Sequence, residues 1–308
     1  MVTNNSNIEI IAFYKFVNLP DYVEIQPILL KLCQENNIKG TILLAKEGLN
    51  GTVSGTELAI NNLKDYFSKD QRLSGIIYKK SLANFKPFYR MKVKLKKEIV
   101  TLGIEGIDPS LKAGKYVEPE DWNNLISDPN TIVIDTRNVY ETKIGSFKYS
   151  IDPKTTNFRE FPEYAEKNLK FAKDKKIAMY CTGGIRCEKS TALLLKMGFK
   201  DVYHLNGGIL NYLEKIPSEQ SLWQGECFVF DNRVAVNKQL EKGKYEQCHG
   251  CRHPITKEDM QSDKYLPGVH CPGCYDTLPA KTVNRAIERQ KQMQLAKSRN
   301  EIHLGDQC

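Results

Sequence analysis

The sequence predicts an α/β protein built from several domains, and three observations support this fold class. The chain has 308 residues, more than one ordinary hydrophobic core accommodates. Strand-like and helix-like apolar patterns alternate along most of it, whereas the last part is rich in cysteine and ends in a long basic helix. A hydrophobic fraction of 41% with 27% charged residues is typical of a globular chain. We expect a first domain over residues 1–100, a linker over 101–120, a second domain over 121–220 and a cysteine-rich region over 221–308.

The first domain alternates strand and helix patterns in the order β-α-β-β-α-β. Its expected strands cover residues 8–16, 41–45, 52–54, 75–79 and 90–98, and its expected helices cover 22–33 and 58–67. Asn50-Gly51 is a strong tight-turn signal, so we place a turn there, between the second and third strands. This order is that of a ferredoxin-like α+β domain with one extra strand.

The end of this domain is strongly basic. Residues 78–97 hold eight lysines and arginines and no acidic residue, with four aromatic residues among them. Strict alternation over residues 91–96 places Lys92, Lys94 and Lys96 on one face of a strand. Such a strand is either a solubilising face or protected edge of a sheet, or a surface that follows a phosphate backbone and offers rings for stacking.

The second domain has apolar runs of strand length at residues 131–134, 176–180 and 201–205, with helical patterns between them. Strands that alternate with helices predict a parallel sheet, whose reactive groups gather at the carboxyl ends of its strands. Asp135-Thr136-Arg137 follows the first run, and Asn206-Gly207-Gly208-Ile209 follows the third.

A cysteine lies at the strand-to-helix turn that follows the second run. The segment reads YCTGGIRCEKS, and the turn after Cys181 is formed by Thr182, Gly183, Gly184, Ile185 and Arg186. Backbone amides at such a turn converge on one point, and the positive end of the helix adds to them. We therefore expect Cys181 to be a thiolate nucleophile stabilised by the amides of residues 182–186, with Arg186 closing the loop. Cys187, in the first helical turn, is either a second, resolving thiol or part of the helix packing.

Four further cysteines have the spacing of a metal site. Cys248 and Cys251 form one C-x2-C pair, Cys271 and Cys274 form another, and nineteen residues separate the pairs. Four thiolates make a closed tetrahedral shell, which predicts a structural zinc ion. The alternatives are free or redox-active thiols, or a site that has lost its metal; His253 and His270 are near enough to replace a cysteine ligand.

A second basic surface is expected on the last helix. Lys281, Arg285 and Arg289 follow one another at four-residue steps along one face. Together with the net charge of +8 and the basic strand, this pattern makes nucleic acid a candidate partner. Arg159 is a further candidate for a phosphate contact, or else a member of a surface salt bridge.

Several classes of protein are disfavoured by what the sequence lacks. It has no apolar stretch of membrane-spanning length, and its first ten residues lack the pattern of a secretory signal. Nine cysteines without export favour a reducing compartment, so we expect a cytoplasmic protein. No dinucleotide glycine fingerprint indicates a flavin or nicotinamide, and the five histidines give no spacing for a non-haem iron site.

Several motifs together carry a family resemblance. The triplet 135–137, the C-x-x-G-x-R loop and LNGGI are similar to a rhodanese domain. Over essentially the whole chain, the sequence resembles the bacterial rhodanese-domain tRNA uridine hydroxylases, in the segments KEGLNGTVSG, DTRNVYETKIGSF, NFREFP, CTGGIRCEKSTALL, YHLNGGILNYLE and WQGECFVFDNRVAV. The usual rhodanese Gly-His-Ile-Pro-Gly is replaced by Gly145-Ser146-Phe147-Lys148, which agrees with the hydroxylase family.

The resemblance implies a function. It implies an oxidoreductase that uses molecular oxygen to convert the wobble uridine of tRNA to 5-hydroxyuridine, with Cys181 as the active-site thiolate and Arg186 orienting the loop or the substrate. It also implies that Asp135 and Arg137 hold the loop scaffold. A sulfurtransferase that carries a persulfide on Cys181, or an RNA-binding module without catalysis, are the alternatives. The sequence does not predict an oligomeric state.

Overall fold

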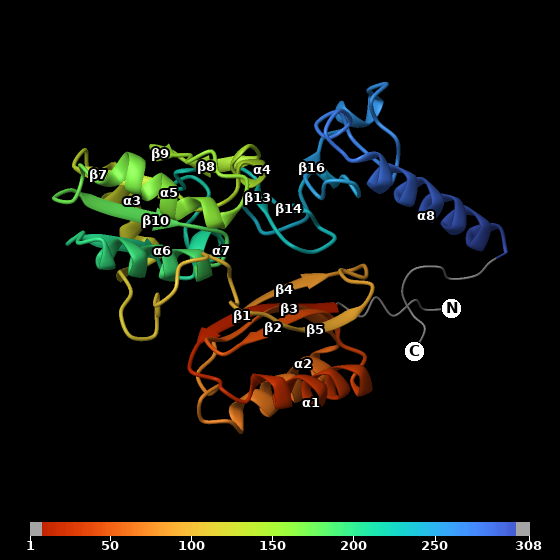
Figure 1. The fold of residues 1–308 in the computed structure, drawn as a ribbon, viewed down its shortest axis with the longest axis horizontal. Helices are drawn as coiled ribbons and strands as arrows, with labels where there is room; N and C mark the ends of the chain where they lie inside the picture. The colour runs from red at the N-terminus through yellow and green to blue at the C-terminus, as the bar shows by residue number, and fades with distance from the viewer. Residues whose placement is uncertain (1–7, 300–308) are drawn as a thin grey trace.

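The computed structural model describes residues 8–299, which form an N-terminal domain, a central domain and a C-terminal cysteine-rich region (Figure 1). The mixed α/β fold class predicted from the sequence is confirmed. The first seven residues, on which part of the signal-peptide prediction depends, and residues 300–308, including Cys308, lie outside the described range. In the described range, no helix combines the length and the apolar character needed to span a bilayer.

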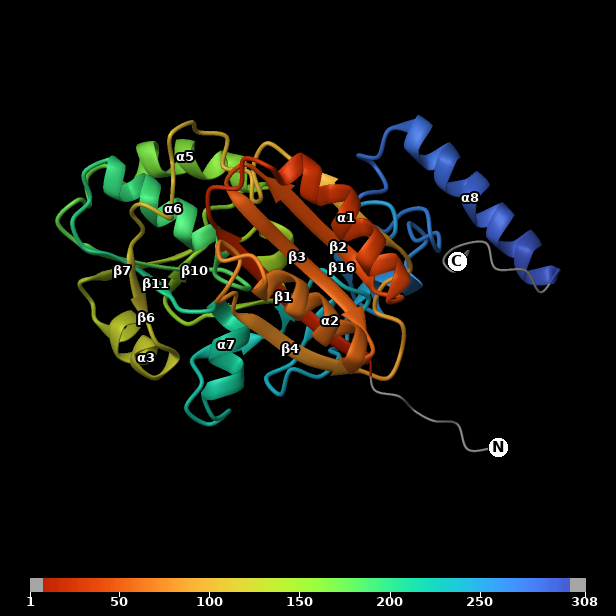
Figure 2. The ribbon, with the colours of Figure 1, turned by 90° about the horizontal axis from the view of Figure 1, so that it is seen from below.

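The N-terminal domain is a five-stranded sheet with two helices on one face (Figures 1 and 2). Its elements are β1 (Ile8–Phe16), α1 (Tyr22–Glu35), β2 (Lys39–Ala45), β3 (Gly48–Gly55), α2 (Glu57–Ser68), β4 (Tyr78–Ala83) and β5 (Met91–Leu95). The strand order is β4-β1-β3-β2-β5. This is the predicted ferredoxin-like arrangement, and β5 is the extra strand, parallel to β2 at the edge of the sheet.

The predicted turn at Asn50-Gly51 is wrong. β2 and β3 are joined at Lys46-Glu47, because Ala45 pairs with Gly48, and Asn50-Gly51 lies inside β3. Close packing explains the glycine there, since a Cβ on Gly51 would lie 2.8 Å from the Phe13 ring. The Asn50 side chain donates a hydrogen bond to the carbonyl of Ile99, 3.0 Å away.

The second face of this sheet is turned toward the central domain (Figure 1). Apolar side chains such as Ile42, Val53 and Val93 pack against the helices, so their alternate neighbours point to the other side. Pairing places one row of residues across all five strands of that second face: Lys79, Ala12, Thr52, Thr41 and Lys92. The edge-strand lysines therefore share a face with Lys79.

The central domain has a five-stranded, fully parallel sheet in the order β6-β11-β10-β7-β9. Its elements are β6 (Lys115–Val117), α3 (Pro119–Ser127), β7 (Thr131–Asp135), α4 (Val139–Thr142), β8 (Gly145–Phe147), β9 (Ser150–Ile151), η1 (Phe158–Glu160), α5 (Phe161–Tyr164), η2 (Ala165–Leu169), β10 (Lys176–Tyr180), α6 (Ile185–Lys196), β11 (Val202–Leu205) and α7 (Gly208–Lys215). Helices cover both faces, as expected for a parallel sheet. The carboxyl ends of β7 and β10 meet at one edge, where Thr136 and Cys181 begin their loops.

Segments outside the predicted limits of this domain complete its core. β6 lies within the range predicted as a linker, and Leu102 and Ile107, from the same range, are buried against the central helices. After residue 221, β12 (Trp223–Gly225) pairs antiparallel with β8, and Trp223 is fully buried beside Phe147. The indole N–H of Trp223 donates to the carbonyl of Gly225, 3.1 Å away.

The C-terminal region has short strands and one long helix. These are β13 (Cys227–Phe228), β14 (Ala235–Val236), β15 (Glu246–Gln247), β16 (Pro254–Ile255), η3 (Asp259–Gln261) and α8 (Ala280–Ser298). The hydrophobic cluster beneath β15 and β16 is small, and three of its four buried members are cysteines. Apolar packing alone is therefore a weak source of stability for this part.

Buried ion pairs dock the N-terminal domain on the central one. Lys189 of α6 is 2% exposed, and its ammonium lies 2.5 Å from Glu98 Oε2 and 2.8 Å from Glu47 Oε2. It also donates to the carbonyl of Val100. These contacts fix the N-terminal sheet beside the helix that starts at the Cys181 loop.

Candidate functional site

Cys181 lies where the sequence predicted, between the end of β10 at Tyr180 and the start of α6 at Ile185. Its side chain is 1% exposed. Gly184 has a φ of +104°, and its amide donates a hydrogen bond to Cys181 Sγ at 3.1 Å. Only glycine is easily accommodated there, because a Cβ would lie 2.8 Å from Tyr14 Oη.

The surroundings of Cys181 favour its thiolate. Burial by itself raises the pKa of the thiol, but hydrogen bonds from Cys187 and Gly184 and the positive charge of Arg186 outweigh burial. The net result is a pKa well below the ordinary value. Within the predicted run of residues 182–186, the amide of Gly184 reaches the sulfur; the amide of Cys187, one residue beyond that run, does so too.

Arg186 is held by a buried carboxylate. Its two terminal nitrogens donate to Glu141 at 2.6 and 2.8 Å, and the Glu141 side chain is fully buried. Glu141 also caps α4 by accepting from the Asn138 amide at 3.0 Å. A bidentate pair of this kind fixes the guanidinium in place. Arg186 therefore has both terminal nitrogens bound by Glu141, and its charge still lowers the pKa of Cys181.

Cys187 is completely buried and lies beside the reactive sulfur. Its Sγ is 3.5 Å from Thr136 Oγ1, and its thiol hydrogen bonds to Cys181. Burial, and then the neighbouring Cys181 sulfur, raise the pKa of Cys187 well above the ordinary value. In this state Cys187 is a neutral donor to the Cys181 thiolate, and a resolving function stays a prediction.

The LNGGI segment, residues 205–209, holds the Cys181 loop through backbone hydrogen bonds. The amide of Ile209 donates to the Cys181 carbonyl at 3.0 Å, and the amide of Leu210 donates to the Thr182 carbonyl at 3.1 Å. Gly208 has a φ of +68°, and a Cβ there would lie 2.4 Å from the same Cys181 oxygen. The first turn of α7 thus holds the backbone of the loop in place.

Asp135 and Arg137 form a buried pair under the site. Arg137 Nη2 lies 2.6 Å from Asp135 Oδ2 and also donates to the Gly145 carbonyl at 2.6 Å. The guanidinium carbon is 5.1 Å from the centre of the Trp223 ring. Neither side chain reaches the surface, which agrees with their predicted function as scaffold.

A large cleft lies between the Cys181 loop and the free face of the N-terminal sheet. Its volume is about 1170 Å³, and Cys181, Thr182, Gly183 and Arg186 line it from the central domain. Tyr14, Asn50, Thr52 and Lys79 line it from the N-terminal domain, and Phe230 and Arg233 line it from the segment after β13. Cys181 thus lines a cleft formed by three segments of the chain.

A carboxyl group beside the loop is held by tyrosines from both domains. Tyr14 Oη donates to Glu188 Oε1 at 2.7 Å, and Tyr116 hydrogen bonds to the same carboxyl. Burial is the main reason why the pKa of Glu188 is raised, and the Cys181 charge adds to it. Tyr116 is 53% exposed and Phe230 is 58% exposed, so part of each ring is open to a ligand in the cleft.

Lys79 of β4 also reaches the loop. Its Nζ donates to the Gly183 carbonyl at 2.7 Å, across the domain boundary. The side chain is only partly covered by area, yet protein from both domains surrounds it, and this desolvation lowers the pKa of Lys79 to about 8. The Cys181 thiolate acts in the opposite direction and raises the pKa of Lys79.

The sequence analysis missed Glu141, Glu188, Tyr14, Tyr116 and Lys79 as site residues. All five are remote in sequence from Cys181 or, like Glu188, look like ordinary helix-surface residues. For Lys79 one signal was available: it stands next to Lys80 in β4, so strand alternation puts the two lysines on opposite faces. Lys80 pairs with Glu9 at 2.7 Å, on the helix side.

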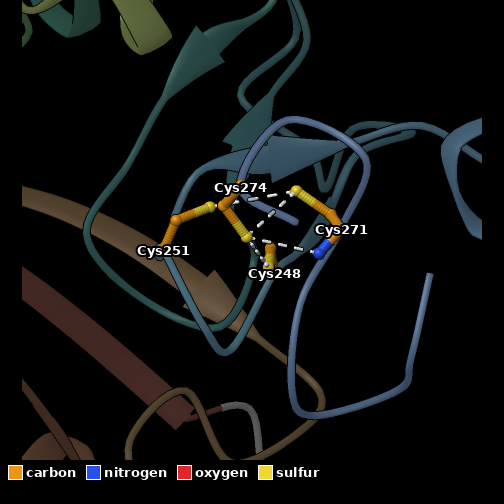
Figure 3. Close-up of side chains that lie close together, drawn as sticks. All are labelled: Cys248, Cys251, Cys271 and Cys274. Atoms are coloured by element: carbon orange, nitrogen blue, oxygen red, sulfur yellow. Dashed lines mark hydrogen bonds between the residues drawn. The ribbon is translucent and has the colours of Figure 1, made fainter. Parts of the chain in front are cut away.

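The four cysteines predicted to bind metal do come together (Figure 3). Their sulfur atoms all lie within 4.8 Å of one another, with Cys248–Cys274 at 3.8 Å, Cys251–Cys271 at 3.9 Å and Cys271–Cys274 at 3.8 Å. A tetrahedron of thiolates with bonds of about 2.3 Å has edges of about 3.8 Å. The cluster therefore fits a metal ion such as zinc.

Neither histidine takes part in this cluster. His253 stacks on Tyr140 with ring centres 4.5 Å apart, and His270 Nδ1 lies 3.0 Å from the Lys264 carbonyl oxygen. The alternative in which a histidine replaces a cysteine ligand is not supported, because the four sulfurs already complete the set.

The predicted RNA-binding residues lie in three places: at β5, on η1 of the central domain and on α8. Lys92, Lys94 and Lys96 are exposed at β5, and among residues 8–299 Arg159, also exposed, forms no ion pair. Arg285 and Arg289 lie on α8 in a hollow that also contains His249 and Arg252. Arg289 donates to the Gly268 carbonyl at 2.8 Å, so part of its hydrogen-bonding capacity is used within the protein.

Comparison with protein families identifies both folded domains. Residues 8–99 match the UPF0176 acylphosphatase-like domain, and residues 118–215 match the rhodanese-like domain. The chain therefore combines these two domain types with a four-cysteine cluster. The rhodanese-like domain indicates an enzyme of the sulfurtransferase-like type.

Several solved structures are similar to about a third of this chain. A rhodanese-related protein from Thermoplasma volcanium is 24% identical, over 33% of this chain and 95% of its own, with a TM-score of 0.27. A Bacillus halodurans protein is 22% identical, over 36% of this chain and 77% of its own, with a TM-score of 0.29. The rhodanese-like domain of an Anabaena protein is 17% identical, over 36% and 78%, also with a TM-score of 0.29.

Proposed function

We propose that this protein is a tRNA-modifying oxidoreductase that hydroxylates the wobble uridine at C5, giving 5-hydroxyuridine with molecular oxygen as co-substrate. The observation that carries this proposal is the position of Cys181, a stabilised thiolate in a cleft of about 1170 Å³ shared by the rhodanese-like and UPF0176 domains. A sulfurtransferase needs the loop alone. The second domain over the loop supports a larger substrate, and the motif resemblance supports this particular one. In this proposal the enzyme is cytoplasmic.

The chemistry of uracil fits a thiolate at this point. Attack of Cys181 Sγ on C6 forms an S–C6 bond and moves the electron pair of the C5–C6 bond toward C5 and O4. C5 then becomes nucleophilic and receives oxygen, after which loss of the C5 proton and of the thiolate restores the ring. The net reaction combines uridine, O2, two electrons and two protons into 5-hydroxyuridine and water, so it also requires a two-electron donor, such as a pair of thiols that forms a disulfide.

The rings in the cleft fit a nucleobase. Tyr116 and Phe230 are half exposed there, and Tyr14 lies next to the Cys181 loop. Aromatic side chains stack on unpaired bases with little dependence on sequence, which is how single-stranded RNA loops are commonly bound. The wobble uridine is such an unpaired base, in the anticodon loop.

The basic strand provides a route for RNA to this cleft. Lys92 lies in the same row across the sheet as Lys79, four strand spacings away, or about 19 Å. Lys94 lies on the same face, and Arg159 is exposed on the central domain. The hollow of α8 adds a second basic surface. Phosphates of one tRNA bound along these surfaces would give a strongly salt-dependent affinity.

The four-cysteine cluster is a structural zinc site in this proposal. Cys248, Cys251, Cys271 and Cys274 would hold the ion, which would stabilise a region whose hydrophobic core is too small to be stable alone. All four positions of a tetrahedral shell are filled by sulfur, so the site is closed and has no position for a substrate.

Sulfur transfer is the second candidate, because the lowered pKa of Cys181 also suits a persulfide carrier. In that reaction the thiolate takes a sulfur atom from a donor such as thiosulfate and passes it to an acceptor such as cyanide. It gives no explanation for the basic surfaces or for the aromatic rings in the cleft.

The test is to incubate purified protein with undermodified tRNA and a thiol reductant under 18O2, and to analyse the nucleosides by mass spectrometry. We expect one 18O atom in 5-hydroxyuridine with wild type and with the control Cys33→Ala, a buried cysteine of the N-terminal core, but none with Cys181→Ala. Product from Cys181→Ala would exclude the thiolate mechanism. Absence of product with wild type, together with turnover of thiosulfate and cyanide, would favour sulfur transfer.

A further inference from the structure

Lys79 is a cation that lines the cleft, reaches the Cys181 loop and retains free hydrogen-bond donors. An ammonium group has three N–H donors, and within residues 8–299 the only acceptor bonded to Lys79 is the Gly183 carbonyl, 2.7 Å away. Arg186, the cation predicted from the sequence, is bound on both terminal nitrogens by Glu141. Arg233, on the other wall, is paired with Asp231 at 2.6 Å and also donates to Ser81. Lys79 alone among these three has no carboxylate partner.

The charge state of Cys181 affects the pKa of Lys79 more than the other nearby groups do. Apart from the Gly183 carbonyl, the groups whose charge acts on Lys79 are Cys181 and Glu188 at the loop, Cys187 in the first turn of α6, and Cys227 of β13; Cys181 and Glu188 line the same cleft as Lys79. Glu188 is engaged by Tyr14 and Tyr116, and burial raises its pKa, so it competes weakly for the ammonium. Cys187 and Cys227 are buried, and their pKa values are raised, so both thiols are neutral. The Cys181 thiolate is the anion left for Lys79.

We propose that Lys79 stabilises the anion that forms at Cys181, so that the active site is complete only when the N-terminal domain contributes this lysine. The anion is the thiolate itself in the free protein. In the reaction it is the enolate oxygen of a uracil adduct or the terminal sulfur of a persulfide. The proposal therefore goes beyond the proposed function and holds for either reaction at Cys181.

The fold explains how a lysine from another domain is held at this point. β4 pairs with β1 so that Lys79 stands beside Ala12, a small residue that leaves room above the sheet. The contacts of Lys189 with Glu47 and Glu98 lock the sheet against α6, and Gly183, without a side chain, exposes its carbonyl to the ammonium. Lys79 is therefore in place at Cys181 only when the N-terminal domain is docked on the central domain.

The experiment measures alkylation of Cys181 by iodoacetamide between pH 5 and 10, by mass spectrometry of the peptide that contains it. It needs no tRNA, so its result is independent of the proposed function. With Lys79→Gln we expect the apparent pKa of Cys181 to rise by about one unit, which slows alkylation about tenfold below that pKa. Lys79→Arg should restore the wild-type profile, because it retains the positive charge. Lys80→Gln is the matched control, since Lys80 adjoins Lys79 but binds Glu9.

A Lys79→Gln profile that coincides with wild type would overturn the proposal. So would a Lys79→Arg profile that follows Lys79→Gln, because the effect would then come from shape and not from charge. If Lys79→Gln does not fold, the same coupling is measured as the pKa of Lys79, by NMR of labelled lysine in the wild type and in Cys181→Ala. Coupling between two sites is reciprocal, so Cys181→Ala should lower the pKa of Lys79 from about 8. An unchanged value would equally reject the proposal.

Discussion

The molecule handles cysteine in two contrasting ways, at the Cys181 loop and at the four-cysteine cluster. At the loop, one sulfur is buried under two amides and a neutral thiol, and its one open side faces a cleft. At the cluster, four sulfurs lie within 4.8 Å of one another, so together they can surround one metal ion (Figure 3). The first arrangement leaves a reactive position free, and the second leaves none.

This difference shows that the surroundings of a cysteine, and not its burial, separate reaction from structure. Cys181 is 1% exposed and Cys248 is 2% exposed, so burial does not distinguish them. Backbone amides that point at a single sulfur stabilise charge without occupying the position where a substrate binds. Three neighbouring sulfurs, by contrast, complete a tetrahedron around an ion. Variants at the two sites should therefore fail in different ways.

The largest effect is expected from Cys181→Ser. Loss of the thiolate should lower 5-hydroxyuridine formation by about three orders of magnitude or more, because a serine hydroxyl stays protonated at neutral pH. The melting temperature should stay close to that of wild type, since the two side chains are nearly isosteric. Nucleoside mass spectrometry and calorimetry on the same preparation measure both quantities. Full activity, or a large drop in melting temperature, would mean that Cys181 belongs to the structural kind of site.

The opposite pattern is expected at the cluster. Cys271→Ser, or treatment with a strong zinc chelator, should release bound metal and unfold the region around β15 and β16, because its apolar core is small. Limited proteolysis should then cleave the C-terminal region at least tenfold faster, while iodoacetamide still labels Cys181 at the wild-type rate. Ser262→Ala, at a half-buried bend of the same region, is the control. Equal loss of Cys181 reactivity would show that the two sites are not independent.

The third variant, Glu141→Gln, tests whether the Cys181 loop itself depends on a buried charge. Glutamine keeps the shape of the side chain but leaves Arg186 buried without a counter-charge, which should cost about 3 kcal/mol of unfolding free energy. Burial opposes ionisation of Glu141, but Arg186 outweighs it, so the pKa of Glu141 is lowered. The stabilisation by this carboxylate is therefore present above its unfolded pKa of about 4.3 and is lost as the pH falls through the lower folded value.

Urea unfolding at pH 7 and at several acidic pH values measures this effect. The difference between wild type and Glu141→Gln should shrink in acid. Glu163→Gln, which removes an exposed pair with Lys167, should cost well under 1 kcal/mol at either pH. A similar small cost for Glu141→Gln would show that the loop does not need the pair.

The parts of each site that are local in sequence could be predicted, and the parts that come from elsewhere could not. Cys181 was found because a strand, two glycines and a helix follow one another, and the cluster was found from the spacing of its cysteine pairs. Glu141 and Lys79 reach the loop only through the packing of distant elements. Strand alternation separates the faces of Lys79 and Lys80, but it does not show that Lys79 contacts the loop.

The error at Asn50-Gly51 has the same cause. The dipeptide favours a turn, but contact between Gly51 and Phe13 of a neighbouring strand places it inside β3. Pairing across the sheet therefore overrides a local preference. The extra strand and the order of the other elements were predicted correctly because they depend on apolar periodicity, which each segment carries for itself.

The smallest effect is expected from Arg285→Gln. This variant tests whether the region of the four-cysteine cluster contributes to tRNA binding without affecting the reactivity of Cys181. Arg285 lies in the hollow beside the cluster with Arg252 and His249, and it makes no hydrogen bond or ion pair within residues 8–299, so it is available for a phosphate. Its loss should weaken tRNA binding about fivefold and reduce the salt slope of log K by about 0.9, without changing alkylation of Cys181. Arg289→Gln should have a smaller effect, because Arg289 is partly used by Gly268. Fluorescence anisotropy over a range of salt concentrations measures both slopes, and an unchanged slope for Arg285→Gln would remove this surface from the RNA path and leave the cluster a purely structural part.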